Sequence, residues 1–360
     1  MTEGNSAKLF ITRPKSFQEA LKLINNAKTS IQFETFTLNG KQGLAIAQAL
    51  IAARARGVNV QAIVDSKSLL VDTGMSLATM LRENGVDVRI YQERNLNDPL
   101  VAIDHAKQLL VDGQTVLVGD SNFDRFVDYD MDYELQGPAV PKLQAMFAQS
   151  WANAKGTGPL VTAGLPSVNP VPTAKGWPVI GGDTQIGITE TAPSSDTQVG
   201  DQTYQNTLKA IANSQKSIDL LMYTMGDPTE LDALKAAAKR GVHVRVVLSP
   251  TKRFYNLEAV RELKEAGIDV RWFKLPPNLN EMHAKVAIFD GKTALGGSTN
   301  WVHSSNQDNH ELGVWMQGAI VNQMEQTYDQ VWKTKTTSIS SLSFLSNIDA
   351  DVMNGVTRII

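Results

Sequence analysis

The chain contains 360 residues, with 34 basic and 37 acidic side chains, a formal net charge of −3 and no cysteine. This length supports two domains that each bury a core, whereas the charge provides no broad basic face for a polyanion. Disulfides and thiol chemistry are excluded, and no apolar run in the sequence is long enough to cross a membrane.

Helices and strands are predicted to alternate along the first half of the chain. Apolar residues at helical spacing indicate helices, and short apolar runs bounded by glycine or polar residues indicate strands. In chain order we predict a helix over 17–27, a strand over 30–36, a helix over 44–56, a strand over 58–64, a helix over 77–83, a strand over 86–91 and two strands over 108–111 and 115–118. Asp112-Gly113 is predicted as the hairpin turn between the last two strands.

The second half of the chain repeats the first. Gly57-Val58-Asn59-Val60 matches Gly241-Val242-His243-Val244, and Phe147-x3-Trp151 matches Tyr328-x3-Trp332. The spacing between matched blocks changes by a few residues along the chain, as expected when insertions lie in loops. A repeat of this length indicates two homologous domains.

Strands separated by helices of ten or more residues imply crossover connections with helices on both faces of a sheet. We therefore predict an α/β fold with two homologous α/β/α sandwich domains, whose mixed, largely parallel sheets are related by a pseudo-twofold axis. The first domain is predicted over 1–158 and the second over 184–360, joined by a Pro/Gly-rich linker over 159–183.

A short motif recurs in both halves. His105-x-Lys107 is followed by Asp112, and His283-x-Lys285 is followed by Asp290, 178 positions later (283 − 105). A single His-x-Lys pair is usually a solvated strand face, but two aligned copies favour one shared site. Two imidazoles and two ammonium groups suit cleavage of a phosphodiester, with one imidazole attacking phosphorus and the other protonating the leaving oxygen.

Other residues near each motif complete the predicted site. Lys107 and Lys285 are expected to stabilise the phosphoryl oxygens, with Asn122 and Asn300 as further amide donors. Each imidazole also needs a carboxylate on its other ring nitrogen to fix the tautomer. The best candidates for this role are Glu134 and Glu311. Glu134 lies 29 residues after His105 (134 − 105), and Glu311 lies 28 residues after His283 (311 − 283).

With these residues the chain resembles the phospholipase D superfamily, whose signature is His-x-Lys-x4-Asp followed by a Gly/Ser-x-Asn turn. The resemblance runs from about residue 7 to residue 332 and includes both turns, Gly119-Asp120-Ser121-Asn122 and Gly296-Gly297-Ser298-Thr299-Asn300. Two further segments resemble the cardiolipin synthase and bacterial phospholipase D branch, namely Gly137-Pro138-Ala139-Val140 and Ser304-x4-Asn309-x-Glu311.

The resemblance implies roles for individual residues. His105 becomes the nucleophile that carries a phosphohistidine, and His283 becomes the general acid. Asp112 and Asp290 are expected to be buried and structural, and Ser298 to assist phosphate binding, a role that Asp120 puts in doubt in the first half. The mechanism requires no metal and no cofactor.

Several other polar residues are interpreted as lying outside the site. Asp128-x-Asp130-x-Asp132 resembles the start of a calcium loop but lacks its glycine and its closing glutamate, so we predict a solvated acidic turn. His243 is predicted to be a surface or structural residue. His303 and His310 lie near the second motif without repeat partners.

The expected substrate is a glycerophospholipid at a membrane surface, with water or a small alcohol as acceptor. Apolar stretches at Leu96–Val101, Phe254-Tyr255 and Leu275–Leu279 suit acyl chains, although they could equally pack against the neighbouring domain. A single-strand nuclease and a noncatalytic binding module are the alternatives, and the charge disfavours nucleic acid. Both half-sites lie in one chain, so no obligate oligomer is expected. The composition favours an exported protein whose leader is absent from the sequence, and the compartment is otherwise left open.

Overall fold

The computed structural model describes residues 1–70, 73–91, 103–124, 127–154, 184–192 and 200–339. The predicted linker, the apolar stretch over 96–101 and the end of the chain from residue 340 lie outside the described residues. The domain boundaries that depend on the linker therefore stay predictions.

The strands form one continuous fifteen-stranded sheet. Its order is β15-β11-β10-β9-β12-β13-β14-β8-β1-β7-β6-β5-β2-β3-β4. The first half contributes β1 (Thr2–Ile11), β2 (Ser30–Thr35), β3 (Asn59–Asp65), β4 (Asp87–Tyr91), β5 (Gln108–Val111), β6 (Thr115–Gly119) and β7 (Met131–Gln136). The second contributes β8 (Thr184–Thr191), β9 (Ser217–Met222), β10 (His243–Leu248), β11 (Asp269–Phe273), β12 (Lys285–Phe289), β13 (Thr293–Gly297), β14 (Glu311–Gln317) and β15 (Thr336–Ser338).

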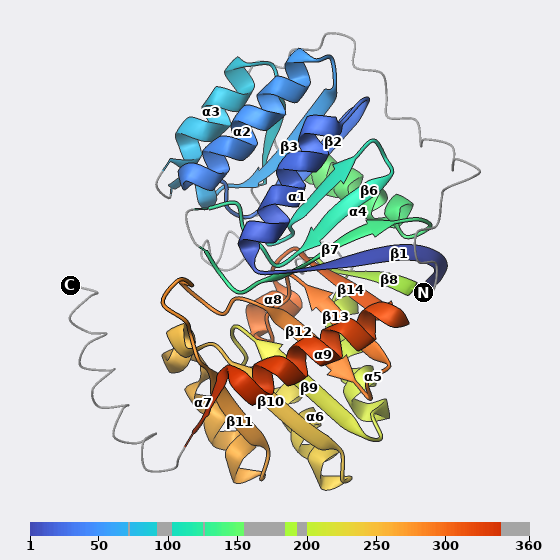
Figure 1. Ribbon diagram of the computed structural model, residues 1–360, viewed down its shortest axis with the longest axis vertical. Coiled ribbons are helices and arrows are strands. Elements are labelled where there is room, and N and C mark those ends of the chain that lie inside the picture. The colour runs from blue at the N-terminus through green and yellow to red at the C-terminus, as the bar shows by residue number, and fades with distance from the viewer. Residues whose placement is uncertain (71–72, 92–102, 125–126, 155–183, 193–199, 340–360) are drawn as a thin grey trace, which may run out of the picture.

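The two halves meet at β1 and β8, which pair antiparallel in the middle of the sheet (Figure 1). Moving outward from this pair, both halves have the same strand order, as a pseudo-twofold axis requires. Parallel pairing joins β2, β3 and β4 and their repeat partners β9, β10 and β11, and the other pairs are antiparallel. The predicted α/β fold with a mixed sheet is confirmed, with parallel strands where helical crossovers connect them. Antiparallel pairs outnumber parallel pairs among the described strands, whereas largely parallel sheets were predicted.

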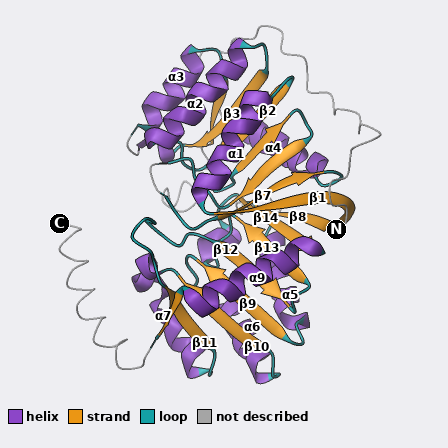
Figure 2. Cartoon of the chain, in the orientation of Figure 1, coloured by secondary structure: helices purple, strands orange, loops and turns teal. Residues whose placement is uncertain are grey.

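Helices cover both faces of the sheet (Figure 2). The described residues form four apolar core clusters between the helices and the strands, and one of these clusters contains residues from both halves. In the first half the helices are α1 (Arg13–Asn26), α2 (Gly40–Ala55), α3 (Gly74–Glu83) and α4 (Val140–Asn153), with the short η1 (Ser68–Leu70). In the second half they are α5 (Gln202–Asn213), α6 (Pro228–Lys239), α7 (Arg253–Glu265), α8 (His303–Gln307) and α9 (Ala319–Thr334), with η2 (Pro250–Lys252). Among the described residues, none of these helices combines the length and apolar character needed to cross a bilayer.

The two predicted hairpin turns are present, and their aspartates brace the sheet. Asp112 and Asp290 have φ of 56° and 54°, and each is followed by a glycine with positive φ, as a type I′ turn requires. The Asp112 carboxylate accepts hydrogen bonds from the backbone N–H groups of residues 28–30 at the start of β2. Asp290 does the same for residues 215–217 at the start of β9. Both aspartates are partly exposed and not buried as expected.

Candidate active site

Each His-x-Lys segment is held in place by the opposite half of the molecule. The backbone N–H of His105 donates to the carbonyl oxygen of His310 at 2.8 Å, just before β14. The backbone N–H of His283 donates to the carbonyl oxygen of Tyr129 at 3.0 Å, just before β7. These reciprocal bonds bring the two motifs together between the halves, as the duplicated pattern predicts.

A carboxylate from the opposite half also holds each imidazole. Nδ1 of His105 lies 2.9 Å from Oε2 of Glu311, and Nδ1 of His283 lies 2.9 Å from Oδ1 of Asp130. Both imidazoles and both carboxylates are buried. Each pair leaves Nε2 as the ring nitrogen that can react, provided the proton resides on Nδ1.

The prediction that Glu134 orients an imidazole is wrong. Glu134 lies inside β7 opposite Lys8 of β1, whereas the carboxylate that reaches His283 is Asp130, four residues earlier. Asp130 is the repeat partner of Glu311, because Gly119 pairs with Asp132 in one half and Gly297 pairs with Gly313 in the other. The corresponding offset of 181 (311 − 130) equals that of Phe147 and Tyr328 (328 − 147), so this signal was present in the sequence.

The predicted solvated acidic turn is instead a buried ion cluster. Asp128, Asp130 and Asp132 are at most 4% exposed. Arg13, itself 1% exposed, pairs through Nε with Asp130 at 2.8 Å and through its terminal nitrogens with Asp124 and Asp128. Burial would raise the pKa of Asp130, but Arg13 and the hydrogen bond from His283 hold it well below its usual range. The carboxylate that orients His283 therefore stays ionised.

We expect Arg13→Met to destabilise the protein by about 3–5 kcal/mol, because it leaves buried carboxylates without their cation. Urea unfolding at neutral pH measures this loss. The matched control is Lys22→Met, since Lys22 is 62% exposed and its partner Glu19 keeps a second cation, Lys8. It should cost less than about 1 kcal/mol. Equal losses for the two variants would contradict a structural role for the Arg13 cluster.

Lys107 and Lys285 are both buried at the site. Each ammonium donates to the backbone carbonyl of the histidine two residues earlier, at 2.6 Å. Burial lowers the pKa of Lys107 to about 7, and the Lys285 charge contributes in the same direction despite the opposing Glu311 carboxylate. Two cations so close together favour an anion between them, and binding such an anion would restore full charge on both.

The two imidazoles are held in similar but unequal environments. Burial lowers the pKa of His105, with Lys107 adding to the effect and Glu311 opposing it. Burial and the Lys285 ammonium lower the pKa of His283 well below its usual range. Nζ of Lys285 also lies 3.0 Å from Nε2 of His283. Without a bound anion, both imidazoles are therefore neutral at neutral pH.

The turns Gly119–Asn122 and Gly297–Asn300 each end in an asparagine near the site. Asn122 and Asn300 are buried, and Oδ1 of neither has a hydrogen-bond partner among the described residues. Asn122 lines the same small cavity as Lys107. The unpartnered atoms are acceptors, so the role of both amides as donors to phosphoryl oxygens stays a prediction.

Ser298 does not offer its hydroxyl to a phosphate as expected. Its Oγ donates to Glu311 at 2.6 Å and accepts from the backbone N–H of Leu312, so it supports the carboxylate behind His105. Asp120, at the same place in the first half, accepts from the backbone N–H groups of Met131 and Lys285. Both residues therefore brace the site from behind.

Sequence reasoning missed an aromatic residue beside each histidine. The ring of Phe36 lies 5.4 Å from that of His105, and the ring of Tyr223 lies 4.6 Å from that of His283. Both follow equivalent strands, β2 and β9, at the same offset of 187 as Ser30 and Ser217 (223 − 36 and 217 − 30). Their partly exposed faces contribute an apolar wall to each half of the site.

The fold and the site together define a class of protein. It has two homologous α/β domains on one sheet, and each domain supplies a His-x-Lys pair whose imidazole is oriented by a carboxylate of the other. The sequence model for the family described as "Cardiolipin synthase, PLD-like domain" matches residues 20–151 and 207–332. The chain belongs to this family, which places it in the cardiolipin synthase-like branch of the phospholipase D superfamily.

Individual relatives and solved structures agree with this assignment. Cardiolipin synthase of Listeria monocytogenes serotype 4a is 25% identical over 350 residues, covering 91% of this chain and 69% of the relative. Cardiolipin synthase of Clostridium perfringens is 25% identical over 384 residues, covering 99% and 77%. The crystal structure of phosphatidylserine synthase from Haemophilus influenzae superposes with a TM-score of 0.72 at 13% identity, covering 98% of this chain and 93% of that one. At this identity the superposition establishes the fold alone.

Proposed function

We propose that the protein is a phosphodiesterase or phosphatidyltransferase of the phospholipase D type that acts on glycerophospholipids. The observation that carries the proposal is the reciprocal pairing of His105 with Glu311 and of His283 with Asp130, beside two buried lysines. Membership of the cardiolipin synthase-like branch supports a phospholipid substrate. The curated relatives are cardiolipin synthases, which supports a transfer reaction alongside hydrolysis.

The proposed reaction has two steps at phosphorus. In the first, Nε2 of His105 forms a P–N bond while the P–O bond to the head-group alcohol breaks, and His283 gives its proton to the departing oxygen. In the second, water or another alcohol loses its proton to His283 and forms a new P–O bond as the P–N bond breaks. Lys107 and Lys285 would stabilise the charge on the nonbridging oxygens in both steps. The negative phosphate would also favour the protonated form of His283 that the first step requires.

An asymmetry between the two imidazoles supports His105 as the nucleophile. Besides its contact with His105, Glu311 accepts hydrogen bonds from the uncharged partners Ser298 and Asn309. The charge of Asp130 is shared with Arg13, which leaves His283 with less stabilisation as a cation. His105 should therefore be the more basic ring and His283 the stronger acid once protonated.

Exposed aromatic residues near the site support an interfacial substrate. Phe254 and Tyr255, at the start of α7, are each 69% exposed. Nζ of Lys252 lies 5.2 Å from the ring centre of Tyr223, which contacts His283, and 5.8 Å from that of Tyr255. A membrane-facing rim is thus proposed beside the second half-site. The other apolar stretch in the described residues is less exposed, because Leu275 and Leu279 pack against the core.

The experiment that tests this proposal is product analysis on vesicles of mixed phosphatidylcholine, phosphatidylethanolamine and phosphatidylglycerol with a little ethanol. Mass spectrometry should detect phosphatidic acid and phosphatidylethanol, or cardiolipin where phosphatidylglycerol is the acceptor. Absence of every lipid product from folded protein would contradict the lipid substrate. Cleavage of single-stranded DNA by the same protein would then support the nuclease alternative.

We expect the double variant Phe254→Ser, Tyr255→Ser to lose about tenfold of its activity on vesicles, because two apolar rings no longer enter the interface. Activity on a monomeric short-chain phosphatidylcholine should change little. The matched control is Met75→Ser, since Met75 is 54% exposed on α3 in the other half. Equal losses on both substrates would show that the aromatic pair does not act at a membrane.

A further inference from the structure

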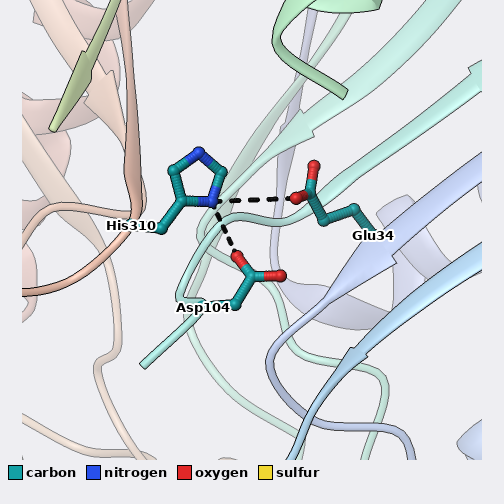
Figure 3. A group of neighbouring side chains, drawn as sticks. All are labelled: Glu34, Asp104 and His310. Carbon is teal, nitrogen blue, oxygen red and sulfur yellow. Dashed lines mark hydrogen bonds and ion pairs between the residues drawn. The ribbon is translucent and has the colours of Figure 1, made fainter. Parts of the chain in front are cut away.

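A second group of buried ionisable side chains lies directly behind His105. It consists of Glu34 from β2, Asp104 and His310, and none of the three is more than 2% exposed. Nδ1 of His310 lies 2.9 Å from Oδ1 of Asp104 and 3.7 Å from Oε1 of Glu34. Figure 3 shows both carboxylates directed at this nitrogen. One donor atom from each residue lies within 4.8 Å of the other two.

The opposite half does not need polar residues at the equivalent positions. Glu34 faces Gln108 across β2 and β5, and Leu221 faces Val286 at the same register of β9 and β12. Asp104 forms an isolated β-bridge with His310, and Met282 forms the equivalent β-bridge with Tyr129. Leu221, Met282 and Tyr129 are ordinary members of the apolar core. The fold is therefore stable with apolar residues here, and the polar set requires another explanation.

The polar set is not balanced by its neighbours. Glu190 of β8 adds a third carboxylate, 2.8 Å from Nε2 of His310, and within the described residues no lysine or arginine forms an ion pair with Glu34, Asp104 or Glu190. Oε1 of Glu34 and Oδ2 of Asp104 have no hydrogen-bond partner there either. A buried carboxylate oxygen without a partner is costly unless a cation occupies the space beside it.

The other His-carboxylate group contrasts with this one. It contains Asp120, Asp130 and His283. Its four carboxylate oxygens accept from the backbone N–H groups of Met131 and Lys285, the imidazole of His283 and the guanidinium of Arg13. That group is complete as it stands and belongs to the active site.

We propose that Glu34, Asp104 and His310 form a binding site for a divalent cation of the zinc or manganese type, which joins the two halves behind His105. Ligands at 2.0–2.2 Å from a tetrahedral ion lie about 3.3 Å apart, between the two distances found here. Glu190, at Nε2 of His310, supplies the carboxylate that orients a ligating imidazole. Nδ1, which hydrogen-bonds Oδ1 of Asp104, would exchange that contact for the ion. The unpaired Oδ2 of Asp104 offers a fourth donor atom.

Such an ion would stabilise the site without entering the reaction. Asp104 precedes His105 in the chain, and His310 precedes Glu311, so the ion would fasten together the two segments that form the His105–Glu311 pair. Chelation is therefore expected to affect thermal stability and the arrangement of the halves, and phosphoryl transfer itself uses no metal in the proposed mechanism.

The test is metal analysis of untagged, full-length protein after dialysis against zinc or manganese and removal of free ion. We expect about one ion per chain, and a melting temperature about 5 °C or more above that of chelated protein. Asp104→Asn should abolish both effects. Asp65→Asn is the matched control, because Asp65 is buried beside the site and accepts the backbone N–H groups of Asp104 and Lys67. It should retain the ion.

A second variant distinguishes loss of the cation site from misfolding of the protein. The triple substitution Glu34→Leu, Asp104→Met and His310→Tyr installs the apolar residues of the opposite half, so it should fold and bind no ion. Ion binding by this variant equal to wild type would place the ion elsewhere and overturn the proposal. Wild-type protein that takes up no ion, and whose melting temperature is insensitive to zinc, manganese and chelator, would also overturn it and identify the cluster as a protonated His310 network.

Discussion

His105→Ala is expected to lower turnover by about 10³-fold or more while the protein stays folded, because it removes the atom proposed to bond to phosphorus. His283→Ala should cause a similar loss with lipid substrates, since the head-group alcohol then departs without a proton. The measurement is the initial rate of phospholipid cleavage, together with thermal unfolding of each variant.

The matched control for both variants is His243→Ala. His243 is an exposed histidine at the start of β10, on the outer part of the second half. Its replacement should leave the rate unchanged. A His105→Ala protein that retains more than about a tenth of wild-type activity would be incompatible with covalent catalysis by this residue.

Asp130→Asn is expected to lower turnover by about 10²–10⁴-fold, because an amide cannot hold the imidazole of His283 in the required tautomer and charge state. Glu134→Gln, which changes the carboxylate on β7 facing Lys8, should have almost no effect on the rate. Comparing the two rates under saturating substrate tests which acidic residue orients the second histidine.

Stability must be measured in the same experiment, since Asp130 also pairs with Arg13. Arg13 keeps Asp124 and Asp128 as partners in the variant, so a folded protein is expected. If Glu134→Gln lost as much activity as Asp130→Asn, the assignment made from the His283–Asp130 contact would have to be abandoned.

The elements with strong local signals could be predicted from the sequence. The predicted strand over 30–36 is β2 (Ser30–Thr35), and the predicted turn at Asp112-Gly113 has the backbone conformation that its residues favour. By contrast, β1 and β8 were missed. Their main partners are β7 and β14 and each other, so their formation depends on contacts with distant parts of the chain.

The core of the site could also be predicted, because duplication marks both motifs in the sequence. The sequence did not predict that each half supplies the carboxylate for the histidine of the other half. Glu311 follows the second motif in the chain but contacts His105 of the first motif. Only the packing of the two halves decides which imidazole a carboxylate reaches. Asp130 was overlooked although its offset of 181 from Glu311 (311 − 130) marks it as the repeat partner.

His310 was interpreted as lying outside the site because it has no histidine as repeat partner. The structure places it between Asp104 and Glu190, directly behind the His105–Glu311 pair. The absence of a repeat partner was itself the informative signal, since Tyr129 and the other equivalent residues are apolar. In a comparison of the two halves, similarity therefore marks the proposed catalytic residues, and difference marks the proposed cation site.

The covalent intermediate provides the most direct test of the central claim. A phosphatidyl ester of p-nitrophenol needs no general acid, because its leaving group departs without a proton. His283→Ala should therefore complete the first step and stall before the second, which lacks its base. Alkaline quenching and peptide mapping should find the phosphatidyl group on the peptide that contains His105. A modification on any other residue, or no burst of p-nitrophenol and no adduct at all, would contradict a phosphatidyl intermediate on His105.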